Sequence, residues 1–176
     1  MKKLQTILVI GMVLLFTTTA AVAKWDPKLT TKCNATIAEF KKSDSGLSTF
    51  FNQAYGYAVF PKIGKAGLGI GGAHGTGAVY KHGAVTGETK MTQLSFGWQA
   101  GGQAYQQIIF FENQKAYDDF TAENFEFSAQ ASAVALKSGV AASTSYSNGV
   151  AVFTQVTGGL MYEATLAGQK YSYKAK

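Results

Sequence analysis

Two lysines beside a glycine-rich stretch are the residues of this sequence whose type and spacing come closest to chemistry. Lys62 and Lys65 follow an apolar, aromatic run that ends at Pro61, and glycine then recurs at nearly every second position as far as Gly77. The chain contains no arginine, so every fixed positive charge on a side chain is a lysine ammonium. An ammonium group binds phosphate as a point charge. These residues therefore predict contact with an anion.

The glycine pattern does not predict a nucleotide site. Residues 67–72 satisfy G-x-G-x-x-G and follow a strand-like run. A dinucleotide fingerprint needs a helix directly after the glycines, because the pyrophosphate binds at the helix N-terminus. Here the residues that follow continue with the period of a strand, so the pyrophosphate would find no helix.

Histidine, serine and cysteine patterns predict neither a metal site nor a catalytic one. His74 and His82 have no set of cysteines or histidines around them, and no Gly-x-Ser-x-Gly motif occurs. Cys33 lies on an apolar helical face with Leu29 and Ile37, which predicts a buried structural thiol. We therefore expect a protein that is not an enzyme and that needs no cofactor or metal.

Two amphipathic helices are predicted in front of the glycine-rich stretch. Asp26 is a good N-cap before Pro27, and an apolar stripe then runs to Phe40 before two lysines that suit a helix C-terminus. A second, short helix has Leu47, Phe50, Phe51 and Ala54 on one face and stops at Gly56. Such stripes face a core more often than a membrane surface, and we expect the core here.

From Tyr57 onward the apolar period changes to two, which predicts strands. One alternating run carries Leu94, Phe96, Trp98 and Ala100, and another extends over residues 125–135. Turns are predicted at Lys81-His82-Gly83, Asn148-Gly149 and Ala167-Gly168, and one inserted helix has Asn113 as its N-cap and Ala116, Tyr117 and Phe120 as its inward face.

The predicted fold class is α+β. An N-terminal helical pair precedes a glycine- and alanine-rich, strongly curved antiparallel sheet or barrel-like sandwich of about eight strands with one inserted helix. The small residues of the glycine-rich stretch suit tight sheet curvature and close packing. The same residues would also suit the floor of a groove for a lipid chain, and the sequence does not separate the two.

Residues 1–23 have the pattern of a cleaved secretory signal, and residues 24–176 form a single domain. The basic start, the apolar run and the Ala-Val-Ala site carry this prediction. Processing would leave 14 lysines against 10 acidic residues, a net charge of +4. This mild excess favours acidic partners such as lipid headgroups, whereas the lack of arginine speaks against nucleic acid.

Four stretches in one order resemble a known family. They are YGYAVFPKIGKAGLGIGGAHGTGAVY, MTQLSFGWQAGGQAYQQIIFFEN, FEFSAQASAVALKSG and GVAVFTQVTGGLMYEATLAGQKYSY. Together they resemble the SYLF (Ysc84-type) lipid-binding domain in its bacterial exported form, over about residues 28–173. The resemblance implies binding of anionic phospholipids without catalysis, in the periplasm or at the outer membrane of the cell envelope. Some relatives bind actin, which we do not expect of this form.

A lipid site follows from joining the residues to the resemblance. Lys62 and Lys65, in a predicted turn after a Tyr57–Phe60 strand, would contact lipid phosphates together with Lys81 and His82 on a neighbouring turn. Tyr57 and Phe60 would meet the apolar part of the lipid. Each lysine would contribute about 1 kcal/mol near an anionic surface. Alternatively, these lysines are ordinary solvated turn residues.

Two other classes of protein fit parts of the pattern. A signal peptide followed by alternating strands suits a small outer-membrane barrel, although the amphipathic helical pair has no place in one. A structural envelope protein that docks a protein partner through its glycine-rich sheet is the second alternative. The sequence predicts neither the preferred lipid nor the oligomeric state.

Overall fold

The computed structural model of the protein describes residues 26–97, 103–122, 124–128, 131–156 and 164–176. The predicted signal peptide lies outside these residues, and so do the strand positions Trp98, Ala100 and Ala129.

The first helix follows the predicted start and stop signals, whereas the second ends at Gln53, before the predicted stop at Gly56. Helix α1 spans Pro27–Ser43, and its N-cap Asp26 accepts a hydrogen bond from the backbone N–H of Lys28 at 2.9 Å. Helix α2 spans Leu47–Gln53. The predicted buried thiol is confirmed, because Cys33 is fully buried and its Sγ lies 3.4 Å from the carbonyl oxygen of Val59, to which it donates. Burial raises the pKa of this thiol to about 11. The apolar stripe of α1 therefore faces the core.

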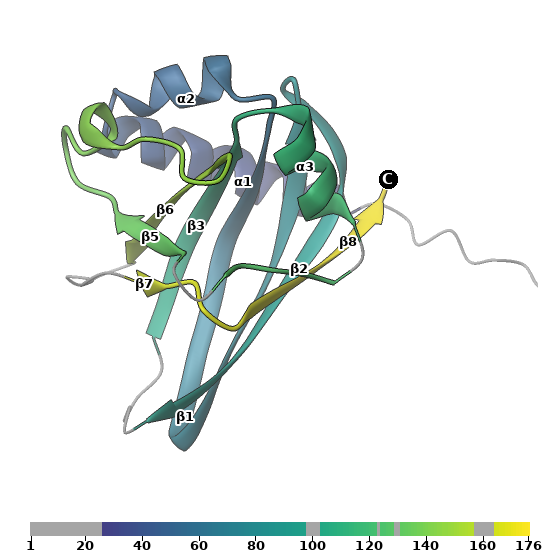
Figure 1. Ribbon diagram of the computed structural model, residues 1–176, viewed down its shortest axis with the longest axis vertical. Helices are drawn as coiled ribbons and strands as arrows, with labels where there is room; N and C mark the ends of the chain where they lie inside the picture. The colour runs from purple at the N-terminus through teal and green to yellow at the C-terminus, as the bar shows by residue number, and fades with distance from the viewer. Residues whose placement is uncertain (1–25, 98–102, 123, 129–130, 157–163) are drawn as a thin grey trace, which may run out of the picture.

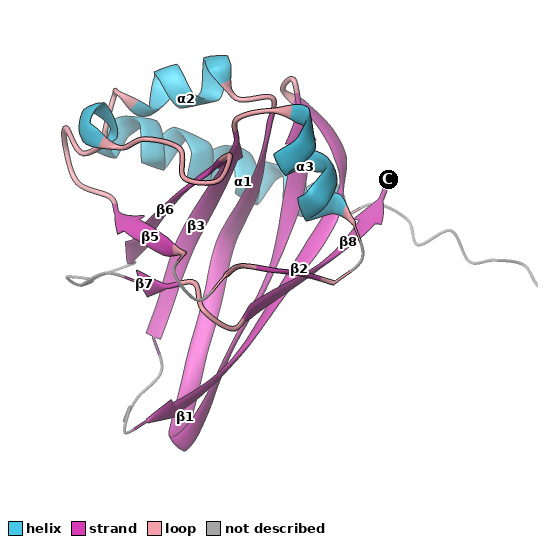
Figure 2. Ribbon diagram, viewed as in Figure 1, coloured by secondary structure: helices cyan, strands magenta, loops and turns pink. Residues whose placement is uncertain are grey.

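Eight strands form one curved sheet in the order β4-β8-β2-β1-β3-β6-β5-β7. Figure 2 shows the helices gathered at one end of this sheet while the strands run on to the other end. Helix α3 spans Gln114–Thr121 with the predicted cap Asn113, and a short 3-10 helix spans Ala141–Ser143. The strands are β1 (Gly56–Lys81), β2 (Ala84–Gly97), β3 (Gln103–Phe111), β4 (Phe125–Glu126), β5 (Ser132–Ala135), β6 (Val150–Val156), β7 (Ala164–Thr165) and β8 (Gln169–Ala175).

The α+β class is confirmed, with two corrections to the strands. The sheet is mixed and not purely antiparallel, since β5 and β6 run parallel with Val134 opposite Phe153. The connection from residue 136 to 149 is long enough to return the chain to the same end of the sheet. The run 125–135, predicted as one strand, is divided into β4 and β5, which pair with different neighbours.

Strand β1 doubles back on itself. Its first leg, residues 56–65, pairs with β3, and its second leg, residues 69–81, pairs with β2. The two legs lie side by side, because the rings of Tyr57 and Tyr80 stack with their centroids 4.9 Å apart. The chain therefore reverses within the glycine-rich stretch.

Two glycines of the second leg allow this close approach. A Cβ atom on Gly77 would lie 2.4 Å from the carbonyl oxygen of Val59, and one on Gly75 would lie 2.6 Å from the Ile63 side chain. Any larger residue would push the legs apart, so at these two positions glycine is required by packing between the legs.

The core lies on both faces of the sheet, which we call the α1 face and the α3 face. Helices α1 and α2 cover the α1 face, whose buried residues include Phe40, Phe50, Phe110 and Phe153. Helix α3 and the short strand β4 pack on the α3 face, whose buried residues include Phe60, Ile63, Phe111, Phe120 and Tyr171. Figure 1 shows that the helices leave the far ends of β1 and β2 uncovered.

The far end of β2 departs from its predicted apolar face. Leu94 was expected on that face, yet it is 76% exposed, whereas Met91 is fully buried. Odd-numbered positions of β2 such as Thr89 and Met91 point into the core, so the even-numbered Leu94 points to the opposite side.

All three predicted turns are confirmed by the backbone. His82 and Gly83 have φ of 49° and 80°, and Asn148 and Gly149 have φ of 51° and 77°. Gly168, between β7 and β8, has φ of 76°. Two consecutive residues with positive φ form the tight turn that joins antiparallel strands, and asparagine and glycine adopt it at low cost.

Candidate functional site

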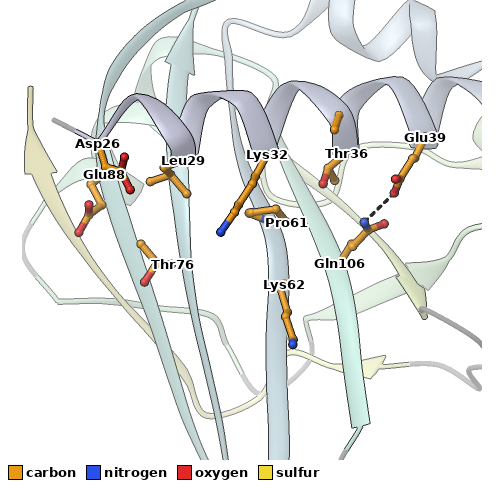
Figure 3. Close-up of a pocket in the computed structure, with 11 residues that line it drawn as sticks. Asp26, Leu29, Lys32, Thr36, Glu39, Pro61, Lys62, Thr76, Glu88 and Gln106 are labelled. Carbon is orange, nitrogen blue, oxygen red and sulfur yellow. Dashed lines mark hydrogen bonds between the residues drawn. The ribbon is translucent and has the colours of Figure 1, made fainter.

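A groove of about 560 Å³ lies between α1 and the sheet and contains the predicted site residue Lys62. Its lining comes from α1, both legs of β1, β2 and β3. Figure 3 shows Lys32 of α1 reaching down beside Pro61, with Lys62 next to it on the first leg.

A bulge in the first leg of β1 places Lys62 on the outside. Phe60 pairs with Gln107 but Ile63 pairs with Tyr105, so the first leg has one extra residue between these pairs. Pro61 has no N–H to donate to the ladder, and proline is typical of such a bulge. Phe60 and Ile63 are both fully buried on the α3 face, while Lys62 is exposed.

The three carboxylates of the groove already have partners. Asp26 caps α1, Glu39 accepts a hydrogen bond from Gln106 Nε2 at 2.7 Å, and Glu88 lies 3.6 Å from the Lys90 ammonium. In Figure 3 Asp26 and Glu88 lie at one end of the groove and Glu39 at the other.

The two lysines between these ends have no such partner. Within the described part of the chain, neither Lys32 nor Lys62 forms an ion pair or a side-chain hydrogen bond. Two lysines on neighbouring elements therefore line one groove in which the acidic groups are committed. This arrangement can bind an anionic group such as a phosphate by charge.

The turn predicted for Lys62 and Lys65 is wrong, since both residues lie within the first leg of β1. The chain reverses only after them, because the bulge at Pro61 kinks the strand without ending it. Lys65 is the last residue of this leg that pairs with β3, opposite Gln103, and it is half-buried. It does not line the groove.

Lys81 and His82 lie at the opposite end of β1, in the predicted turn. Lys62 lies beside Gly75, and the second leg covers about 20 Å from there to Lys81 at about 3.3 Å per residue. The Lys81 ammonium lies 4.9 Å from the ring centroid of Tyr55 and 5.7 Å from that of Tyr117. A side-chain hydrogen bond to Tyr55 is the main cause that raises the Lys81 pKa.

His82 packs its ring against Tyr55 with the centroids 4.9 Å apart. The structure therefore does not bring Lys81 and His82 together with Lys62.

Tyr57 and Phe60, predicted to meet the apolar part of a lipid, lie in the core. Tyr57 is 8% exposed and stacks on Tyr80 on the α1 face, while Phe60 is fully buried on the α3 face. Neither side chain forms an apolar surface next to Lys62. An even separation of residues places two side chains on one face of a strand, whereas 57 and 60 differ by three.

Lys32 is the residue that sequence reasoning missed. It directly precedes the buried Cys33 on α1, so it lies at the border of the buried stripe, and its exposed side chain extends from the helix toward the sheet. A lysine at the edge of an apolar stripe was the available signal, but the strand that it faces follows only from the packing of α1 on the sheet.

Two further properties concern the described residues. None of their helices combines the length and apolar character needed to span a membrane. Nor do three or more of their His, Cys, Asp or Glu side chains gather in a group able to hold a metal ion.

One protein family and one curated relative are similar to parts of this chain. A family model named Ysc84, described as Las17-binding protein actin regulator, matches residues 92–176. A relative from Aeromonas veronii, "Beta cell expansion factor A", is 33% identical over 124 residues, which make up 69% of this chain and 46% of the relative. The chain thus spans about half the length of that curated relative.

Proposed function

Residues 92–176 belong to the Ysc84 (SYLF) family, as the sequence resemblance predicted, and from this premise we propose that the protein binds anionic phospholipids without catalysing a reaction. The groove between α1 and the sheet is the proposed headgroup site, with Lys32 and Lys62 as the groups that contact the phosphate. These two lysines lie outside residues 92–176, so the support for their role is the geometry of the groove.

The unpartnered state of the two lysines is the observation that carries this proposal. An ammonium already held by a carboxylate must give up that partner before it contacts a phosphate, whereas Lys32 and Lys62 have no such partner among the described residues. At about 1 kcal/mol per lysine, the pair would contribute about 2 kcal/mol to attachment at an anionic surface. This attachment would be weak and would decrease with added salt.

The proposed location is the cell envelope, either the periplasm or the inner surface of the outer membrane. The predicted signal peptide and the lysine excess support this proposal. The partner that we propose is the membrane surface, not nucleic acid and not actin. Co-pelleting with filamentous actin is the direct check on the last point, and we expect the protein to stay in the supernatant.

Vesicle co-sedimentation tests the headgroup site. The double variant Lys32→Ala/Lys62→Ala should bind phosphatidylglycerol-containing vesicles about 30-fold more weakly than the parent at low salt, the equivalent of about 2 kcal/mol. The double variant Lys42→Ala/Lys137→Ala removes the same charge from two exposed positions that do not line the groove. Equal loss in both variants would leave only nonspecific charge attraction, and no loss in the first would remove the groove from consideration.

A further inference from the structure

A second cavity, of about 390 Å³, lies on the other side of the sheet and shares no residue with the groove. Its walls come from α3, β4, β5, β6 and the segment 144–148. The volume falls within the range of small-molecule sites. We call it the α3-face pocket.

The floor of this pocket is apolar. Phe127, Val152 and Leu166 are almost fully buried beneath it, and they belong to the core of the α3 face. Phe125 and Val150 also line the pocket but are only half-buried, so they leave apolar surface open to an occupant. A hydrocarbon chain would cover this surface and remove it from water.

The rim of the pocket is polar, and most of its uncharged hydrogen-bonding side chains have no partner among the described residues. Four serines, an asparagine and a threonine line it. The hydroxyl of the threonine, Thr144, donates to the carbonyl oxygen of Val140. The other five side chains form no hydrogen bond to another described group: Ser128, Ser132, Ser145, Ser147 and Asn148.

Both acidic side chains that line the rim form ion pairs with lysines. Asp119 lies 2.6 Å from the Lys115 ammonium, and Glu126 lies 3.7 Å from that of Lys170. Among the described residues, the rim therefore offers hydrogen bonds but no unpaired charge. This differs from the groove, where the acids are committed and the lysines are not.

We propose that the α3-face pocket binds a single-chain lipid with an uncharged, hydrogen-bonding head, such as a monoacylglycerol. The hydrocarbon chain lies on Phe125, Phe127 and Val150, and the hydroxyl groups of the head bond to the rim serines. A charged headgroup gains nothing at this rim, because each ammonium there is paired with a carboxylate. The site is separate from the proposed phosphate site and acts independently of it.

Fluorescence of N-phenyl-1-naphthylamine, an uncharged apolar dye, provides the test. The full chain should bind the dye saturably in a ratio of one to one, and monododecanoylglycerol should displace it more effectively than dodecyl phosphate. Ser132→Phe places a ring at the rim from an exposed strand position and should weaken dye binding roughly tenfold by occupying the pocket. Ser172→Phe, exposed on β8 and away from the pocket, is the matched control.

A second rim variant and a groove variant complete the test. Ser147→Phe adds a ring to the pocket from the segment 144–148 and should weaken dye binding as Ser132→Phe does, so one folded variant of the two is enough for the test. Lys32→Ala/Lys62→Ala should keep dye binding unchanged, even where it loses vesicle binding. Dye binding by both rim variants equal to that of the parent would overturn the proposal, as would failure of monododecanoylglycerol to displace the dye.

Discussion

The two basic regions of β1 differ in what already contacts their ammonium groups. At the turn, Lys81 lies over the rings of Tyr55 and Tyr117, and its neighbour His82 packs on Tyr55. In the groove, Lys62 and Lys32 have no charged partner among the described residues. By residue type alone, the two regions were equally good candidates for binding an anion. Their packing differs: Lys81 contacts aromatic rings at the turn, while Lys62 has no charged partner among the described residues.

The close packing of the two legs of β1 holds both regions in place. A substitution that disrupts this packing should have the largest effect on stability. Gly77→Ala places a Cβ 2.4 Å from the carbonyl oxygen of Val59, so it should lower the free energy of unfolding by about 3 kcal/mol. Gly64→Ala is the control, because a Cβ there meets nothing within 4 Å. Chemical denaturation of both variants checks this, and equal stability would contradict the close approach of the legs.

The position of α1, which carries Lys32, depends on a buried carboxylate at its C-terminal end. Asp44 accepts hydrogen bonds from the backbone N–H groups of Ala141 at 2.7 Å and Gly46 at 2.9 Å. Asp44→Asn replaces one acceptor oxygen by an NH₂ group that faces a donor. We expect a loss of about 2 kcal/mol in the free energy of unfolding at neutral pH.

The pH dependence of this loss follows from the pKa of Asp44. Hydrogen bonds, first that from Ala141, lower the pKa below its ordinary value. The charged form therefore stabilises the fold above the unfolded-state pKa of about 3.9, and this contribution disappears as pH falls through the lower pKa of the folded state. The stability difference between parent and Asp44→Asn should shrink below about pH 4, and a constant difference would show that the carboxylate charge is irrelevant.

The smallest expected effect concerns the turn. Lys81→Ala removes the ammonium from the two tyrosine rings and should lower the melting temperature slightly, while Lys65→Ala should leave it unchanged. Differential scanning calorimetry of both variants measures this. A larger change for Lys65→Ala than for Lys81→Ala would reverse the assigned roles.

Local signals in the sequence were sufficient for most elements. Asp26 and Asn113 are the caps of α1 and α3, and each predicted turn contains a residue with positive φ, because caps and turns depend on neighbouring residues only. Asn124 and Gly139 also have positive φ but were not predicted as turns. The reversal within β1 was not predicted, since glycines carry no side-chain period that marks where one leg ends.

The candidate site was predicted only in part, because local sequence patterns do not specify how distant elements pack. Lys62 was named, but its neighbour Lys32 is brought to it by the packing of α1 on the sheet, which no local pattern specifies. Phe60 was predicted to meet the lipid because it directly precedes the predicted lysine turn, but it is buried on the α3 face. The bulge at Pro61 turns Ile63 to that same face.

Vesicle binding of Lys62→Ala and Lys81→Ala, measured side by side at low salt, tests the difference between the two regions most directly. Both variants lose one positive charge from the same strand. We predict that Lys62→Ala binds phosphatidylglycerol-containing vesicles roughly fivefold more weakly than the parent and that Lys81→Ala binds them as the parent does. Equal loss in both variants, or a greater loss in Lys81→Ala, would contradict the assignment of the groove as the lipid site.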